Sequence, residues 1–157
     1  MNPAPTVLVL DTNVVLDLFV YEDPATAALR ERLADPRVRW LATPVMREEL
    51  RRVLDYPQVV KRLEARGLEA SQVLSAFDAR ATLTGVAPKA PYTCKDGDDQ
   101  PFIDLAVQHT ATLLSKDKAV LCMRKRLATL GVAVSRQWPA CDPAAGAGAP
   151  APRTAAA

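Results

Sequence analysis

The sequence predicts an α/β fold, a three-layer α/β/α sandwich around a central parallel sheet of four to five strands. Short apolar runs rich in β-branched residues alternate along the chain with amphipathic segments. The first run, residues 6–10 (TVLVL), is apolar throughout, as expected for a strand covered on both faces. With 157 residues, 49% hydrophobic and 24% charged, the chain has the size and composition of one globular domain.

Prolines preceded by capping residues mark the helix starts in the first half of the chain. Asp23-Pro24 and Thr43-Pro44 each pair an N-cap residue with a proline at the first helical position. Gly67 stops a later helix. The expected elements are a strand at 6–10, helices at 14–20 and 25–34, a strand at 38–42, and helices at 45–54, 58–66 and 71–83.

The second half begins with residues 86–98, where two prolines and one glycine, directly after Gly85, predict loop or extended chain. Beyond it the expected elements are a helix at 99–110, a strand at 111–115, a helix at 118–130 and a strand at 132–135. We place the domain boundary at residue 142, because residues 143–157 are rich in alanine, proline and glycine and predict a disordered tail.

The composition excludes several classes of protein. The single histidine, His109, excludes sites with several histidine ligands, and the three cysteines form no C-x-x-C pair. Reduced cysteines fit a cytoplasmic protein. No apolar run approaches the roughly 18–20 residues of a membrane span, so we expect no membrane association. A net charge of +2 leaves any nucleic-acid contact to local basic patches.

Acidic residues stand where the expected sheet ends. Asp11 follows the first strand, and Asp117 comes two residues after the strand at 111–115. Asp99 opens the helix that leads into that strand, within the acidic run Asp96, Asp98 and Asp99. Because the crossovers are right-handed, strand ends and helix starts meet at one edge, where ligands bind. Asp99 and Asp117 also have a simpler interpretation, as helix N-caps.

The helix at 45–54 adds a fourth acid to this edge. Its apolar stripe includes Met46, Leu50 and Val53, and at about 100° per residue Glu49 borders that stripe while Glu48 points to solvent. Two carboxylates about 4 Å apart repel by roughly 4 kcal/mol at an effective dielectric of about 20. A divalent cation such as Mg²⁺ or Mn²⁺, which prefers oxygen ligands, would relieve that repulsion.

Four segments resemble the PIN-domain family of metal-dependent ribonucleases: VLVLDTNVVLD at 7–17, TPVMREELRRVL at 43–54, DGDDQPFIDLA at 96–106 and LLSKDKAVL at 113–121. The resemblance covers about residues 6–136 and is strongest for the toxins of toxin–antitoxin pairs. It implies a PIN-like fold, an RNA substrate, Mg²⁺ or Mn²⁺, and an endoribonuclease that leaves a 3′-hydroxyl and a 5′-phosphate.

The resemblance also implies roles for individual residues. Asp11 and Asp99 match the main metal ligands of the acidic quartet, and Glu49 and Asp117 complete it. The supporting polar positions are Thr12, Asn13 and Ser115, the further candidates are Asp96, Asp98 and Asp104, and the arginines offered to RNA are Arg47, Arg51 and Arg52. We interpret Asp104 as solvated, and each basic cluster alone as a solvated helix face. The resemblance further implies an antitoxin partner and allows a homodimer.

Two other classes of function compare with this interpretation, and only the first remains open. The alternative is a non-catalytic PIN-like module that binds RNA or protein, although all four acids of the quartet are present. A phosphatase of the haloacid-dehalogenase type would need D-x-D after the first strand, where this chain has Asp11-Thr12-Asn13. Glycine-rich phosphate loops, which nucleotide-dependent enzymes use, are absent from the sequence.

Overall fold

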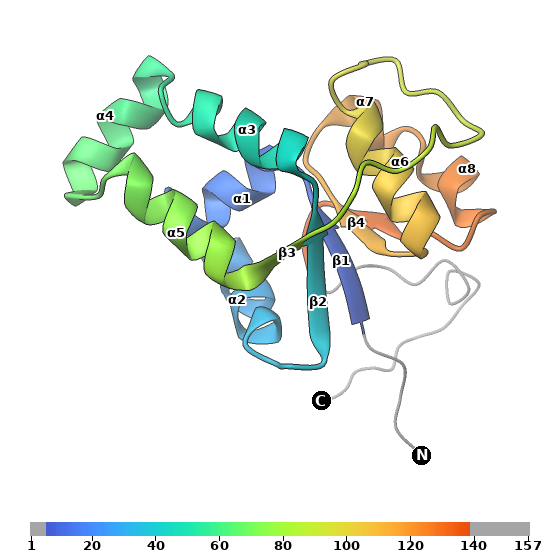
Figure 1. Ribbon diagram of the computed structural model, residues 1–157, viewed down its shortest axis with the longest axis horizontal. Coiled ribbons are helices and arrows are strands. Elements are labelled where there is room, and N and C mark those ends of the chain that lie inside the picture. The colour runs from blue at the N-terminus through green and yellow to red at the C-terminus, as the bar shows by residue number, and fades with distance from the viewer. Residues whose placement is uncertain (1–5, 139–157) are drawn as a thin grey trace.

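A sheet of five parallel strands forms the centre of the computed structural model, which describes residues 6–138 (Figure 1). The strands are β1 (Thr6–Leu10), β2 (Val38–Ala42), β3 (Ala81–Leu83), β4 (Thr112–Leu114) and β5 (Val134–Ser135). Their order across the sheet is β3-β2-β1-β4-β5, and every neighbouring pair is parallel. The predicted fold class is therefore confirmed. The predicted domain boundary at residue 142 and the tail at 143–157 lie outside the described residues.

Helices cover both faces of this sheet (Figure 1). Helices α2 and α5 pack on β2 and β3, whereas α6 packs on β1 and β4, and α8 on β5. The helices are α1 (Thr12–Phe19), α2 (Ala27–Leu33), α3 (Pro44–Val53), α4 (Pro57–Arg66), α5 (Ala70–Arg80), α6 (Gln100–His109), α7 (Lys118–Leu121) and α8 (Arg124–Ala128), with a short 3-10 turn, η1, at Pro24–Thr26.

The direction of the chain across the sheet reverses between β1 and β4. From β1 the chain moves outward to β2 and β3, then returns to place β4 and β5 on the other side of β1. The loops that leave β1 and β4 consequently diverge, and in a parallel sheet this opens a crevice at the carboxyl ends of the two strands. Asp11 follows β1 and Asp117 follows β4, so both acids border that crevice.

The core lies between the sheet and its helices and contains the large apolar side chains that the pattern predicts. Trp40, Met46 and Phe102 are buried, as expected. Trp40 stacks on Phe19 at 6.1 Å between ring centroids and meets the edge of Phe77 at 5.0 Å. These contacts join α1, β2 and α5.

Two predicted helices differ from the structure. The helix predicted at 71–83 ends at Arg80, and Ala81–Leu83 forms the edge strand β3. Its partner β2 offers unpaired backbone groups at that edge, so a long-range ladder replaces three residues of helix. The helix predicted at 118–130 divides into α7 and α8 at Cys122 and Met123. The division buries Val120, Met123 and Leu127 together.

Gly67 ends α4 as predicted, in the left-handed conformation at φ 66° that other residues adopt at a cost. Among the described residues, no helix has both the length and the apolar character needed to cross a membrane.

Candidate active site

Asp11 lies at the centre of the crevice, held between the first and fourth strands. Its backbone N–H donates to the carbonyl of Leu114 at 2.9 Å, which extends the β1–β4 ladder by one residue. The hydroxyl of Ser115 donates to Asp11 Oδ2 at 2.6 Å, and the same oxygen of Ser115 accepts the backbone N–H of Asp117 at 3.0 Å. Burial raises the pKa of Asp11, and the Ser115 hydrogen bond opposes that rise.

Asp99, at the start of α6, lies close enough to Asp11 for their charges to interact. Its side chain makes no capping hydrogen bond to the helix, so the simpler N-cap interpretation does not describe it. Its Oδ2 atom is buried and has no hydrogen-bond partner among the described residues. Such an atom forfeits hydration without compensation, and it points to a ligand that the carboxylate would hold.

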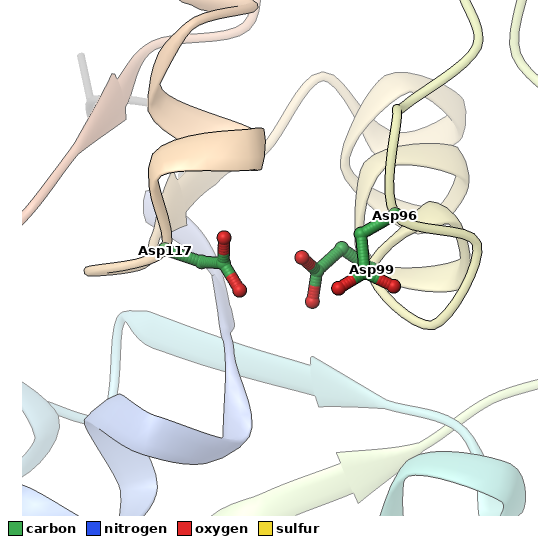
Figure 2. A group of neighbouring side chains, drawn as sticks. All are labelled: Asp96, Asp99 and Asp117. Atoms are coloured by element: carbon green, nitrogen blue, oxygen red, sulfur yellow. The ribbon is translucent and has the colours of Figure 1, made fainter.

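Three aspartates, Asp99 among them, come together at this edge of the sheet. One oxygen each from Asp96, Asp99 and Asp117 lie within 4.8 Å of one another (Figure 2). Figure 2 shows Asp117 at the start of α7 pointing toward Asp96 and Asp99, which come from the turn before α6. Asp117 also caps α7, because its Oδ1 accepts a 2.8 Å hydrogen bond from the N–H of Ala119. Asp117 is therefore both a helix cap and a member of the acidic group.

The closeness of these acids makes the ionised form of Asp99 unfavourable. Burial is the largest cause, followed by the charge of Asp11 and the hydrogen bond with Asp117, and together they raise the pKa of Asp99 from 3.8 to about 8. In the absence of a cation, the raised pKa of Asp99 therefore favours its protonated form near neutral pH. A cation would displace that proton.

Glu49 adds a carboxylate to the site from α3, on the helix face that the sequence pattern predicts. We call the carboxylates of Asp11, Glu49, Asp99 and Asp117 the acidic wall. The Glu49 side chain is half-buried, whereas Glu48 is exposed. Burial raises the pKa of Glu49, a hydrogen bond from the Thr12 side chain lowers it, and the charges of Asp11 and Asp98 raise it. Asn13 contributes from the first turn of α1, where its Oδ1 accepts the N–H of Lys116 at 3.5 Å.

The donor set fits a hard divalent cation. The group is made of carboxylates alone, it holds an unpartnered buried oxygen, and no arginine or lysine within the described residues pairs with Asp96, Asp99 or Asp117. Oxygen ligands of this kind suit Mg²⁺ or Mn²⁺. Asp96, Asp99 and Asp117 are placed to hold such an ion, with Asp11 and Glu49 beside them.

The remaining acidic candidates separate in the structure. Asp96 belongs to the tight group, because its Oδ1 accepts the N–H of Asp98 at 3.0 Å and the turn brings it back beside Asp99. This local turn is the signal in the D-x-D-D run that would have ranked Asp96 above its neighbours. Asp98 is exposed and faces Glu49. Asp104 is half-buried, not solvated, since its Oδ1 accepts from Ala90 N and Gln100 Nε2 at 2.8 and 2.7 Å.

The three arginines of α3 differ in what they contact. Arg47 binds Asp78 of α5 through two hydrogen bonds of 2.7 and 2.8 Å. Arg51 pairs with Glu48 one turn earlier in the same helix. Arg52 instead lines a groove together with Glu49 and Asp98. The structure therefore brings one arginine of the three, Arg52, to the acidic site.

A contact that the sequence did not indicate holds the loop after β4. Lys116 lies between Ser115 and Asp117, and its ammonium pairs with the buried carboxylate of Asp17 at 2.5 Å. Asp17 stands on α1, so this ion pair ties the loop after β4 to the helix after β1. A lysine in a loop and an acid inside an apolar helix give no local signal of pairing.

The Ser115→Ala variant is expected to lose about 1.5–3 kcal/mol of unfolding free energy at pH 7, the usual worth of a hydrogen bond to a charged group. The substitution removes the donor to Asp11 Oδ2 and the acceptor of the Asp117 N–H. Urea unfolding measures it, with Ser135→Ala as the matched control, because Ser135 is less buried and its hydroxyl bonds only to the backbone of Gln137, two residues later. Equal stabilities of the two variants would contradict the role given to Ser115.

The comparison with protein families gives one finding. A family model described as PIN domain matches residues 7–119, more than half of the chain, and this span includes Asp11, Glu49, Asp99 and Asp117. The search of curated proteins found no match.

Proposed function

Because the chain belongs to the PIN-domain family, we propose that it is a metal-dependent endoribonuclease that hydrolyses RNA phosphodiester bonds at the acidic site around Asp99. The observation that carries the proposal is the buried carboxylate of Asp99, whose Oδ2 has no hydrogen-bond partner among the described residues and which lies beside the carboxylates of Asp96 and Asp117. Holding ionised carboxylates this close together in a partly buried site costs free energy unless a cation is bound, and a structural role alone does not account for that cost.

The catalytic carboxylates of this proposal are those of Asp11, Glu49, Asp99 and Asp117. The carboxylate of Asp96 is a fifth candidate metal ligand. A bound Mg²⁺ or Mn²⁺ would polarise the phosphate, lower the pKa of a water molecule and stabilise the leaving oxygen. Within the chain, Ser115 orients Asp11 and Thr12 orients Glu49, so neither carboxylate has to reorganise. Because its pKa is raised to about 8, Asp99 holds a proton near neutral pH until a cation replaces it.

We further propose that the protein is the cytoplasmic toxin of a type II toxin–antitoxin pair. The resemblance of the four motif segments to that subgroup supports the proposal. An antitoxin would block the enzyme most directly by inserting an arginine or lysine between Asp99 and Asp117, because that cation would satisfy the same unpartnered oxygen. Homodimerisation belongs to the same proposal and is tested by the oligomeric state in solution.

Cleavage of a labelled, largely single-stranded RNA tests the nuclease. The purified protein is incubated with Mn²⁺, with Mg²⁺ and with EDTA, beside Asp11→Asn and Glu64→Gln purified identically. We expect cutting with either metal, none in EDTA, and none by Asp11→Asn, because that variant weakens the acidic wall at its centre. Glu64 is exposed on α4, so Glu64→Gln controls for purification and is expected to cut normally.

Two outcomes would count against the proposal. Equal cutting by wild type and Asp11→Asn would indicate a contaminating nuclease. No cutting with either metal, together with intact RNA binding, would favour the non-catalytic PIN-like binding module.

A further inference from the structure

A groove runs beside the acidic site, between α3 and the turn that precedes α6. Its volume is about 240 Å³. Glu49 and Asp98 form its acidic end, while Val53 and Pro101 contribute apolar surface. The groove therefore begins at the candidate active site and continues along α3 as a mixed apolar and charged surface.

Arg52 gives this groove its positive charge. Within residues 6–138, Arg52 forms no ion pair, in contrast to Arg47 and Arg51 on the same helix. It stands three residues after Glu49, which corresponds to a rise of about 4.5 Å along the helix. A guanidinium that lines the same groove as Glu49 and Asp98 is suited to a phosphate that neighbours the one held at the acidic site.

Tyr56 is the aromatic residue of the groove. Tyr56 follows α3, the residue is 49% exposed, and it is one of four large hydrophobic residues that the described chain exposes. Proteins hold single-stranded nucleotides by combining an exposed aromatic ring with an arginine that has no ion-pair partner. The ring stacks on the base, and the arginine binds the phosphate.

We propose that this groove is a nucleotide subsite, in which Tyr56 stacks on the base next to the scissile phosphate and Arg52 binds the adjoining phosphate. The inference rests on the proposed ribonuclease function and adds where the RNA lies. It places the strand along α3 from Glu49 toward Tyr56. Tyr56 and Arg52 are positioning residues for substrate, so their loss weakens RNA binding and raises KM more than it lowers kcat.

Binding of a fluorescently labelled single-stranded RNA, followed by anisotropy in the Asp11→Asn background with Mn²⁺, tests the subsite without cleavage. Tyr56→Ala is expected to weaken binding about 10-fold, and Tyr56→Phe to restore it, because stacking needs the ring alone. Arg52→Gln is expected to weaken binding and to lower the salt dependence of log K by about one phosphate contact. Arg51→Gln is the matched control and is expected to bind like the parent, since Arg51 is paired with Glu48.

A substrate series locates the base. Single abasic nucleotides are moved along the RNA, and at one position next to the cleavage point the abasic change and Tyr56→Ala are expected not to add. Binding by Arg52→Gln and Tyr56→Ala equal to that of Arg51→Gln would overturn the subsite, even if wild type cleaves RNA. Weakened binding by both, with no cleavage by wild type, would overturn the nuclease and leave the subsite standing.

Discussion

The Asp99→Asn variant is expected to lose metal-dependent RNA cleavage by about 10²-fold or more, which is the usual effect of removing one preorganised group that stabilises the transition state. It should also lose the thermal stabilisation that Mn²⁺ gives the wild type, which would be about 2.7 kcal/mol at a metal concentration 100 times Kd. The reason is that Asp99 supplies the buried oxygen that has no hydrogen-bond partner among the described residues, so a cation bound to Asp99 stabilises the fold more than one bound to an already paired carboxylate. Cleavage assays and thermal melts with and without Mn²⁺ measure both effects.

The same substitution is expected to stabilise the protein in EDTA. Each rise of one in the pKa of an acid disfavours its ionised form by about 1.4 kcal/mol. Because the pKa of Asp99 is about 8 in the fold, a neutral amide at this position should raise the melting temperature at pH 8. Asp55→Asn, at an exposed aspartate, is the matched control and should change neither melt. Stabilisation of Asp99→Asn by Mn²⁺ to the wild-type extent would contradict the ligand role.

Raising the pH from 4 to 8 is expected to destabilise the metal-free protein. Asp99 has a pKa of 3.8 when unfolded and about 8 when folded, so the folded state binds its proton more tightly. The stability that this proton contributes is complete below about pH 4 and is lost as the pH rises through 8, at up to about 1.4 kcal/mol per pH unit. Burial raises the pKa values of Asp11 and Glu49 as well, which acts in the same direction.

Urea unfolding in EDTA at pH 5, 6.5 and 8 measures this dependence, and Asp99→Asn should flatten it. With saturating Mn²⁺ the trend should reverse, because the cation binds ionised carboxylates and displaces the proton. Asp35 has the opposite sign, since Arg37 lowers its pKa to about 2, but its contribution is lost only as the pH falls from about 4 to 2. A stability in EDTA that stays constant or rises between pH 5 and 8 would contradict the protonated state of Asp99.

The sequence by itself determined the features that depend on local pattern and on the rules of parallel sheets. The apolar run at 6–10 specified a buried strand, and that strand placed Asp11 at its carboxyl end. The Thr43-Pro44 cap and the stripe through Met46 and Leu50 specified α3 and turned Glu49 toward the sheet edge. Periodicity and capping act over a few residues, so one sequence is enough to recognise them.

The tertiary structure alone decided which partner each polar side chain has. It joined Asp96 to Asp99 and Asp117, and it turned Asp104 to the backbone of Ala90. It also placed Asp78 beside Arg47 from 31 residues away, which left Arg52 to the groove.

The edge strand β3 was decided in the same way, by an unpaired neighbour, β2, about 40 residues earlier in the chain. Hydrogen bonds, ion pairs and strand ladders of this kind depend on distances between segments far apart in sequence. Those distances are fixed only when the sheet and its helices pack, because packing brings the segments together and excludes the water that would otherwise satisfy their polar groups.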